Sequence, residues 1–380
     1  MIAIDIIIPT LIEVENLKKF EISSFPSWTG NWFPIWYNNK RLKKNGLKIR
    51  FFNLYNINLN NLSNIIGIDN KIIYDLETIY GRTNILDKKN KLLLSFIKKL
   101  NSKGKKLLYF DNKDGTDIQQ QFLPYINLYL KKQLLKNRSL YNKKVYLKRL
   151  FTEFYAQNYE VDISDEFQYS FDSFSEYNDI IKLSWNFALK DYRYSNEFSR
   201  FLCGLTRKIN IDFQKPGLDR RYLLSANFSV KSFNELLYFQ RKELLKFLKS
   251  NYKSRPDISL GRIPKKEYIN VVNNSLAILS PFGWGEICYR DFETFIAGAA
   301  LIKPDMEHIE TWPDFYLKNE SYLSISWEIE KWSTEIPNIL SNKKKLYRTG
   351  VRGQNLYKKL WSEKGQTNFC VRFKNLIQDL

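Results

Sequence analysis

Short apolar runs alternate with longer segments of helical periodicity along most of the chain. This alternation is typical of an α/β fold, because parallel strands are joined by crossovers that usually contain a helix. In the first half we expect strands over residues 3–9, 47–53, 71–76, 106–111 and 180–185. The helices expected there cover residues 33–45, 89–102 and 119–154, the last with its lysines facing solvent.

The same alternation starts again after about residue 190, which indicates a second sheet. A chain of 380 residues has room for two cores, since one domain usually contains about 100 to 200 residues. We therefore predict two doubly wound domains over residues 1–188 and 189–350, with C-terminal helices over 351–380 that pack back on the first domain. The elements expected after residue 190 are strands over 222–227, 277–280 and 300–303, and helices over 233–250, 265–274, 287–298 and 368–380.

The formal net charge of the chain is +20. A positive field of this size attracts phosphate in any form, so nucleotides, nucleic acids, anionic lipids and anionic glycans are all compatible partners. The lysines are scattered over both halves rather than concentrated in one stripe, and no motif that reads nucleic acid is present. We therefore expect no nucleic-acid partner, although charge alone does not choose among the others.

Metal ligands and membrane-spanning runs are both scarce in the sequence. Cys203, Cys288 and Cys370 have no paired spacing, and Asp162 and Asp165 do not form an Asp-x-Asp pattern, so no metal site is expected. The same cysteine usage points to a reducing compartment. No apolar run approaches the roughly 20 residues that span a bilayer, so we expect a cytoplasmic protein that can also lie on the cytosolic membrane face.

Residues 280–306, SPFGWGEICYRDFETFIAGAALIKPDM, predict a strand, a glycine-containing loop, a helix and a strand. Gly283 and Gly285 let the backbone approach a ligand, because glycine has no Cβ. The N-terminal end of the helix offers free N–H groups and a positive dipole to an anion. A diphosphate therefore fits this segment.

Arg290 and Glu293 lie three residues apart on the expected helix and so share a face. A guanidinium can hold phosphate oxygens, and a carboxylate can accept hydrogen bonds from both hydroxyls of a ribose. The alternative is an ordinary ion pair on a helix surface. Lys303 would add charge beside the diphosphate or face solvent, and Glu286 would act in the site or only stabilise the helix start.

The segment GRIPKKEYINVVNNSLAILSPFGWGEICYRDFETFIAGAALIKPD, residues 261–305, resembles the nucleotide-sugar domain of GT-B glycosyltransferases. The likeness is strongest to the exostosin-like and glycosyltransferase group 1-like enzymes. It implies a GT-B fold, in which two Rossmann-like domains face a cleft, and a nucleotide-sugar donor as substrate. On this resemblance Glu293 would bind the donor ribose, Arg290 the phosphates, and Arg262 would border the nucleobase.

One spacing departs from the GT-B pattern. That pattern places seven residues between two glutamates, whereas six separate Glu286 from Glu293 in this sequence. The role of Glu286 and the stereochemistry of transfer therefore stay open. The donor-binding residues expected in all are Arg262, Gly283, Gly285, Glu286, Arg290, Glu293 and Lys303.

Three aspartates, Asp111, Asp114 and Asp117, lie at the carboxyl end of the strand expected over 106–111, where a doubly wound sheet places its ligands. The resemblance implies a general base from the N-terminal domain, and Asp114 is the first choice, followed by Asp111. The alternative is that DNKDG only forms a turn. His308 is a further catalytic candidate, or else a hydrogen-bonded structural histidine.

The aromatic stretch over residues 23–37, with Gly30, either stacks on acceptor sugars or packs an entry helix.

Together, the sequence features and the resemblance predict a metal-independent glycosyltransferase, hexosyl or pentosyl, that needs no cofactor. Its acceptor would be a glycan, a lipid-linked or a protein-linked acceptor in surface-glycan biosynthesis. Two other classes stay open, a basic nucleic-acid-binding protein and a catalytically silent GT-B scaffold.

Overall fold

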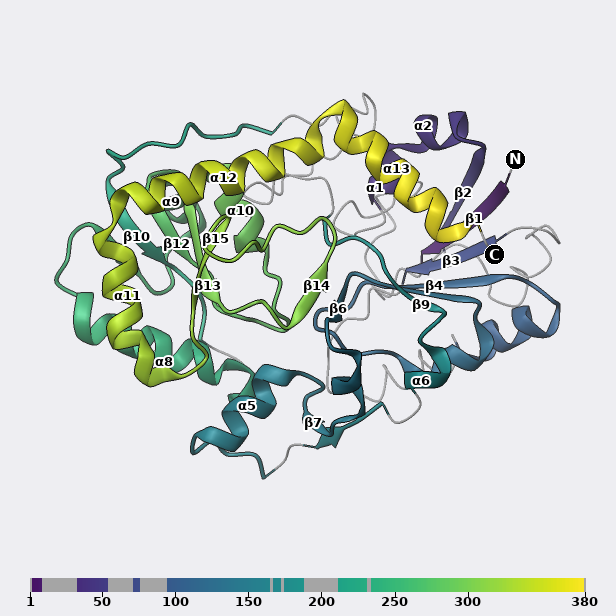
Figure 1. Ribbon diagram of the computed structural model, residues 1–380, viewed down its shortest axis with the longest axis horizontal. Helices are drawn as coiled ribbons and strands as arrows, with labels where there is room; N and C mark the ends of the chain where they lie inside the picture. The colour runs from purple at the N-terminus through teal and green to yellow at the C-terminus, as the bar shows by residue number, and fades with distance from the viewer. Residues whose placement is uncertain are drawn as a thin grey trace, which may run out of the picture.

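The structure is a computed structural model that describes residues 2–8, 33–53, 71–75, 94–164, 167–171, 174–187, 211–230 and 234–378. Two sheets form its centre, one from each half of the chain, and they lie side by side in Figure 1. The first sheet runs in the order β2 (Leu47–Asn53), β1 (Ile2–Ile8), β3 (Lys71–Asp75), β4 (Leu107–Asp111), β5 (Leu128–Lys131) and β9 (Ile181–Leu183). The second runs in the order β11 (Ile258–Leu260), β10 (Tyr222–Ala226), β12 (Ser275–Leu279), β13 (Ala300–Pro304) and β15 (Tyr322–Ile325).

Every strand pair inside these two sheets is parallel. The expected strands of both halves are confirmed to within two residues at each end. Helices surround the sheets, and the expected ones over 233–250, 265–274 and 287–298 are also present. The helices of the second half are α8 (Glu235–Tyr252), α9 (Lys265–Asn273), α10 (Tyr289–Ala297), α11 (Trp332–Ser341), α12 (Lys343–Trp361) and α13 (Glu363–Ile377).

Burial explains why these strands could be located from the sequence. Strands β4, β12 and β13 are buried along their whole length. A parallel sheet is covered on both faces, so its strands are continuous apolar runs rather than alternating ones. Helix starts are also set locally, since the Asn234 side chain accepts a hydrogen bond of 2.8 Å from the N–H of Leu237 and caps α8.

The prediction of one long helix over residues 119–154 is wrong. The structure has in its place η1 (Gln120–Tyr125), β5, β6 (Gln133–Leu135), η2 (Arg138–Asn142), β7 (Val145–Tyr146) and α5 (Leu150–Asn158). Because β5 pairs with β4 and β9 on its two sides, its apolar run is a buried strand, which periodicity does not distinguish from a buried helix. Lys131 and Lys132 are buried rather than solvent-facing, since each pairs with an aspartate.

Other boundaries differ for local reasons. The helix expected over 33–45 is divided into α1 (Phe33–Tyr37) and α2 (Asn39–Lys44), and the Asn38 side chain between them bonds to Pro34 O and to Gln366. A helix over 94–102 matches the end of the one expected from residue 89, whose first residues lie outside the described ranges. The structure adds β11, β15 and two short strands, β8 (Gln168–Tyr169) and β14 (Ile309–Thr311), and a short helix, α6 (Phe174–Tyr177).

The C-terminal helices connect the two halves. Helix α12 lies along the second sheet, whereas α13 lies against α2 of the first half, so the yellow end of the chain crosses the molecule in Figure 1. The Asn38 amide donates to Gln366 at 2.6 Å, and the Arg372 guanidinium donates to Leu183 O at 2.6 Å. Helix α12 continues without a break through residue 350, where the C-terminal segment was expected to begin.

The two halves also share a hydrophobic core. One cluster of buried side chains contains residues of both halves, and the rings of Phe151 and Phe282 lie 5.0 Å apart. Strands β6 and β14, one from each half, pair antiparallel between the two sheets. Two parallel α/β sheets with C-terminal helices confirm the GT-B type of architecture expected from the sequence.

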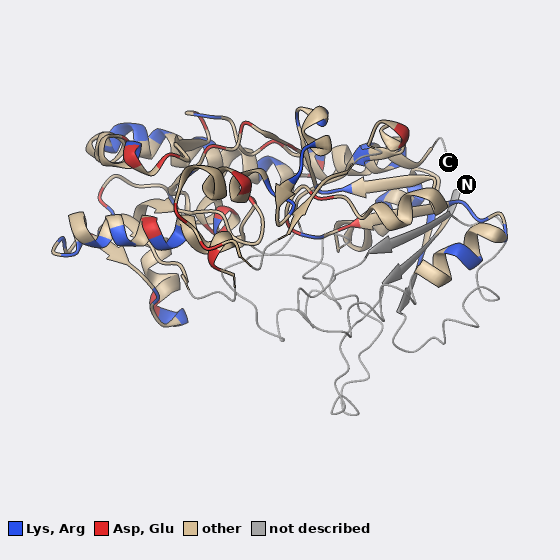
Figure 2. Cartoon of the chain, turned by 90° about the horizontal axis from the view of Figure 1, so that it is seen from below, with Lys and Arg blue, Asp and Glu red and all other residues tan. Residues whose placement is uncertain are grey.

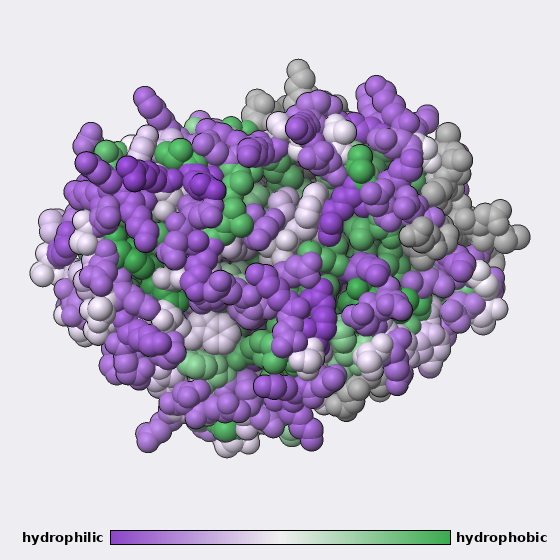
Figure 3. Space-filling model, viewed as in Figure 1, coloured by the Kyte–Doolittle hydropathy of each residue, from purple (hydrophilic) through white to green (hydrophobic). Residues whose placement is uncertain are grey.

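The surface is mainly polar on the face seen in Figure 3, where hydrophobic residues show only in separate areas between hydrophilic ones. No helix in the described part of the chain is both long enough and apolar enough to cross a bilayer.

Candidate functional site

The loops that follow the carboxyl ends of β4 and β12 meet between the two sheets. A Cβ at Gly285 would overlap the backbone nitrogen of Gly115 and lie 3.1 Å from the carbonyl carbon of Asp114. The Arg149 guanidinium joins the same loops, because its Nε donates to Trp284 O and its Nη2 donates to Asp114 O at 3.2 Å. At Gly285, therefore, the expected cleft is closed by contact between the halves.

Helix α8 holds the other side of the glycine loop. Gln240 accepts a hydrogen bond of 3.1 Å from Phe282 N, and Arg241 donates to Phe282 O. A Cβ at Gly283 would lie 2.7 Å from Arg241 Nη2. Gly285 is thus required by backbone contacts within the protein, whereas a side chain at Gly283 would have to displace the Arg241 guanidinium.

Arg290 lies in the first turn of α10 and faces the end of β10. Its Nη2 donates to Asn227 O at 3.0 Å, and its guanidinium lies 5.8 Å from the centre of the Phe228 ring. Its Nε is buried and has no hydrogen-bond partner among the described residues. Burial alone would lower the pKa of Arg290, but Tyr268, Cys288 and Glu293 outweigh it and raise the pKa, so the side chain is a cation with a donor to spare.

Glu293 lies one turn further along α10 and accepts a hydrogen bond from Tyr268 Oη. Burial and the Glu293 carboxylate both raise the pKa of Tyr268. The structure therefore brings Arg290 and Glu293 together around Tyr268, at the carboxyl ends of β10 and β11. Arg262 is exposed beside this cluster, next to Gly261, whose carbonyl accepts from the Asn227 amide at 2.8 Å.

A second buried arginine, Arg241, was not predicted. It extends from α8 toward the start of α10, where its Nη2 lies 3.9 Å from Cys288 Sγ. Burial lowers the pKa of Arg241, and the charge of Arg290 lowers it further, so the two guanidiniums are electrostatic neighbours. In the sequence, Arg241 belongs to the helical run QRKELLK and resembles a solvated charge, so only the tertiary structure identifies it.

Lys303 is wholly buried and its charge is matched inside the protein. Its Nζ lies 3.1 Å from the carboxylate of Asp291, which is also wholly buried. Asp291 accepts further hydrogen bonds from Ser280 and Tyr316. From the sequence, the Lys303 side chain was expected either to lie beside the diphosphate or to face solvent. The buried pair with Asp291 differs from both expectations.

Glu286 lies in the loop before α10 and is wholly buried. It accepts a hydrogen bond of 2.8 Å from Gln133 Nε2 of the first half, and its Oε1 lies 3.4 Å from His308 Nε2. Burial raises the pKa of Glu286, but His308 and Arg149 outweigh it, so the pKa is lowered. His308 Nδ1 and Gln133 Oε1 are buried and lack hydrogen-bond partners within the described residues, so the cluster retains one open position from each half.

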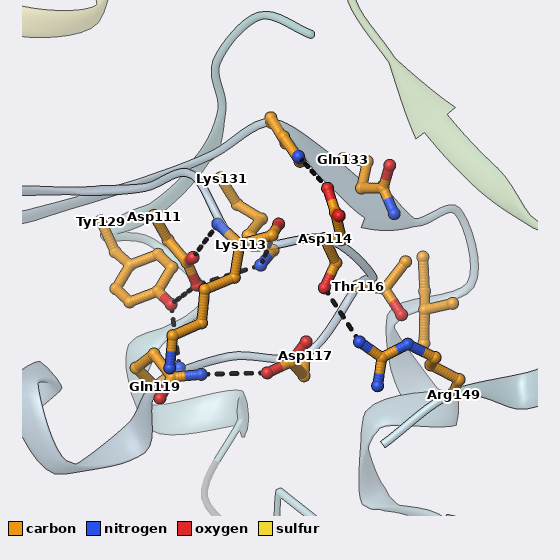
Figure 4. Close-up of polar contacts among 12 residues, drawn as sticks. Asp111, Lys113, Asp114, Thr116, Asp117, Gln119, Tyr129, Lys131, Gln133 and Arg149 are labelled. Atoms are coloured by element: carbon orange, nitrogen blue, oxygen red, sulfur yellow. Dashed lines mark hydrogen bonds and ion pairs between the residues drawn. The ribbon is translucent and has the colours of Figure 1, made fainter. Parts of the chain in front are cut away.

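The three aspartates at the end of β4 and in the loop after it have different environments (Figure 4). Asp111 is wholly buried and accepts hydrogen bonds from Tyr129 Oη and, at 3.0 Å, from Lys131 Nζ. Asp114 has a 42% exposed side chain, and its Oδ1 accepts from Lys132 Nζ at 2.6 Å. Asp111 therefore holds the loop, and Asp114 is the more accessible of these two.

Asp117 has one bonded and one open carboxylate oxygen. Its Oδ2 accepts from Gln119 Nε2 at 2.9 Å, whereas its Oδ1 is buried without a partner in the described part of the chain. Burial raises the pKa of Asp117, but the charges of Lys131, Arg149 and other cations outweigh it and lower the pKa. The carboxylate is therefore ionised at neutral pH.

The remaining expectations concern aromatics and metals. Residues 23–32 of the aromatic stretch lie outside the described ranges, while Phe33 and Trp36 are core residues with ring centres 5.3 Å apart. Over the ranges that the structure describes, no three His, Cys, Asp or Glu side chains gather in a way that could hold a metal ion.

Comparison with known proteins found likenesses of structure only. No protein-family model matches the chain, and no curated protein sequence matches it. A glycosyltransferase from Rickettsia africae ESF-5 is 13% identical with a TM-score of 0.46, and the likeness covers 100% of this chain and 99% of that one. A structure described as a UDP-N-acetylglucosamine 2-epimerase of Listeria monocytogenes is 9% identical with a TM-score of 0.45, covering 100% and 98%.

An α,α-trehalose 6-phosphate synthase from Burkholderia multivorans is 9% identical, with a TM-score of 0.44 and coverage of 84% of this chain and 73% of that one. All three TM-scores are below 0.5. The function is therefore inferred from the fold and the contacts of this chain's own residues.

Proposed function

We propose that the protein is a glycosyltransferase that transfers a hexose or pentose from a nucleotide-sugar donor without a metal ion. The observation that carries the proposal is the cluster of Arg290, Glu293 and Tyr268 at the carboxyl edge of the second sheet, beside buried Arg241. Ligands of doubly wound sheets bind at this edge. The cluster supplies cations for a diphosphate and a carboxylate for a ribose.

In this site Arg290 Nε, buried and without a partner among the described residues, donates to a donor phosphate oxygen. Arg241 adds a second positive charge, and the N-terminal end of α10 adds the helix dipole. Glu293 exchanges its bond from Tyr268 for the ribose hydroxyls. Arg262 borders the nucleobase, while Gly283, Gly285, Glu286 and Lys303 shape the loop and its supports.

In the transfer, the acceptor hydroxyl oxygen forms a bond to the anomeric carbon and the bond from that carbon to the diphosphate breaks. The hydroxyl proton passes to a general base, for which the half-exposed Asp114 is the first choice. Asp111 positions the loop through Lys131 and Tyr129. His308, held against Glu286, would hydrogen-bond the transferred sugar or the leaving diphosphate.

The setting of this reaction is also a proposal. The acceptor is a glycan, a lipid-linked or a protein-linked acceptor in surface-glycan biosynthesis, and the enzyme works in the cytoplasm with peripheral contact to an anionic membrane. We propose an acceptor domain over residues 1–188 and a donor domain from residue 189 onward. We further propose that the C-terminal segment that packs on the first half begins with α13, because α12 contacts β12, β13 and β15 whereas α13 contacts α2.

The decisive experiment measures the melting temperature of the protein in the presence of UDP, GDP, CMP and ADP and of their nucleotide sugars. Each measurement is made with and without EDTA. A ligand at about 100 times its Kd stabilises the folded state by about 2.7 kcal/mol. We expect one base to raise the melting temperature regardless of EDTA, and Arg290→Met and Glu293→Gln to abolish the rise. Arg348→Met and Glu267→Gln, at exposed positions on α12 and α9, should leave it intact.

An absence of any nucleotide effect would overturn the proposal and favour a silent scaffold. Nucleic-acid binding has less support, because Lys and Arg are spread over elements of both halves in Figure 2 instead of forming one stripe. Titration with RNA at several salt concentrations tests for nucleic-acid binding, since the affinity from phosphate contacts falls steeply as the salt concentration rises.

A further inference from the structure

A cavity of about 370 Å³ lies in the first half of the molecule, and none of the residues that line it is among those proposed to hold the donor. It begins at Thr116, immediately after the loop that contacts Gly285, and is bounded by parts of η1, η2, β7 and β8. Its volume lies within the usual range of about 300 to 1,000 Å³ for small-molecule sites. The residues that give it chemical character are Asp117, Tyr141, Lys143, Lys148, Tyr169 and Phe171.

The first of these, Asp117, supplies an acceptor of hydrogen bonds. Its Oδ1 is buried without a partner in the described ranges, while Gln119 holds the other oxygen (Figure 4). A buried carboxylate oxygen without a donor is costly, so a ligand that donates a hydrogen bond to it is favoured. Hydroxyl groups of a sugar are donors of the right kind.

The walls combine aromatic rings with positive charge. Tyr141 and Phe171 are buried, whereas Tyr169 is 44% exposed and lines the cavity. Lys148 Nζ lies 4.9 Å from the centre of the Tyr169 ring, and Lys143 also lines the cavity. The two lysines exceed the single carboxylate, so the cavity favours a ligand that carries a negative charge.

The cavity lies next to the proposed donor loop. Tyr141 is close enough to Glu286 for that carboxylate to raise its pKa, after the larger effect of burial. Arg149 links the two regions directly, because its charge acts on Asp117 while its Nε donates to Trp284 O. A ligand in the cavity would therefore lie beside the loop that precedes α10.

We propose that this cavity binds an anionic sugar, a uronic acid or a sugar phosphate, as the acceptor of the transfer. Asp117 Oδ1 accepts a hydrogen bond from a ring hydroxyl, Tyr169 stacks on the sugar, and Lys143 and Lys148 hold the acidic group. The role as acceptor rests on the proposed function, whereas the binding itself does not.

The test is titration of the protein with glucuronate, galacturonate, glucose 6-phosphate and neutral glucose, followed by NMR without any nucleotide. At least one acidic sugar should bind about tenfold more tightly than glucose. Asp117→Asn should weaken that binding about tenfold, and Lys148→Gln should remove the preference for the acid. The matched control Asp219→Asn, at an exposed position, should bind as the wild type does.

Tyr169→Ala keeps the test decisive if Asp117→Asn fails to fold, because Tyr169 is half exposed and its loss should weaken sugar binding without unfolding the chain. No binding of any acidic sugar, or binding that both Asp117→Asn and Tyr169→Ala leave unchanged, would overturn the inference. Failure of the proposed function appears separately, as absence of nucleotide stabilisation with sugar binding intact.

Discussion

At the scale of residues, two lysine–aspartate pairs in the described part of the chain are wholly buried, one in each half of the molecule. Lys131 pairs with Asp111 at 3.0 Å, and Lys303 pairs with Asp291 at 3.1 Å. Removing ions from water is costly, and a buried pair is retained only where further hydrogen bonds complete it. Tyr129 and Tyr316 make those bonds, so each pair forms part of a network that fixes a loop at a sheet edge.

Removing the lysine of a buried lysine–aspartate pair should destabilise the fold. We expect Lys131→Met to lower the free energy of unfolding by about 3 to 5 kcal/mol, because the buried Asp111 carboxylate would lose the cation that hydrogen-bonds to it. The double variant Lys131→Met, Asp111→Asn should recover part of the loss. Urea unfolding measures both, with Lys242→Met as control, since its exposed pair with Glu235 should contribute less than about 1 kcal/mol. A loss in Lys131→Met no larger than in this control would contradict the expectation.

The lowered pKa of Glu286 predicts a dependence of stability on pH. A carboxyl whose folded pKa lies below its unfolded value of 4.5 stabilises the fold above that pH, and this contribution is lost as pH falls through the folded pKa. The difference in unfolding free energy between the wild type and Glu286→Gln should therefore shrink as pH falls below 4.5. Urea unfolding at a series of pH values tests this, and exposed Glu267→Gln should show no such change.

At the scale of elements, the close approach of α12 to the second sheet depends on glycine. A Cβ at Gly350 would lie 2.7 Å from Gly298 O and 3.0 Å from Ala300 N. These are backbone atoms, which do not move aside as a flexible side chain does. Helix α12 and strand β13 are therefore held at a distance that only glycine allows.

We expect Gly350→Ala to destabilise the protein. Overpacking costs about 1 to 3 kcal/mol, whereas the better helix propensity of alanine returns at most about 1 kcal/mol. The net loss should be up to roughly 2 kcal/mol in urea unfolding. Asn355→Ala, at an exposed position of the same helix, isolates the propensity effect and should be neutral or slightly stabilising. A stabilised Gly350→Ala would show that α12 can shift freely.

At the scale of the whole molecule, several sets of contacts join the two halves. They share one hydrophobic cluster, they pair through β6 and β14, and α13 crosses from the second half to the first. The ring of Phe369 on α13 lies 5.0 Å from that of Trp185, which follows β9. Separate unfolding of either half would break all of these contacts.

The chain should accordingly unfold in a single transition despite its two sheets. Tryptophan fluorescence and far-ultraviolet circular dichroism should give coincident curves in urea. Lys131→Met, which lies in the first half, should shift the whole transition rather than one part of it. Two resolved transitions, with only one shifted in that variant, would contradict the shared core.

Local patterns were sufficient to predict the two sheets, the glycine loop and the shared face of Arg290 and Glu293. Buried parallel strands are continuous apolar runs, and residues three apart on a helix are neighbours, so no distant contact is needed to predict them. The helix predicted over residues 119–154 was wrong because a short apolar run looks the same in the sequence whether it forms a buried helix or a buried strand.

The tertiary structure alone decided which charges are buried and what they contact. Arg241 meets Phe282, 41 residues away, and Gln133 meets Glu286, 153 residues away. In the sequence, a buried lysine or arginine cannot be distinguished from a solvent-exposed one. Its partner depends on how the sheets and helices pack. The open oxygen of Asp117 and the cavity beside it were decided in the same way, because a cavity is a property of packing and not of sequence.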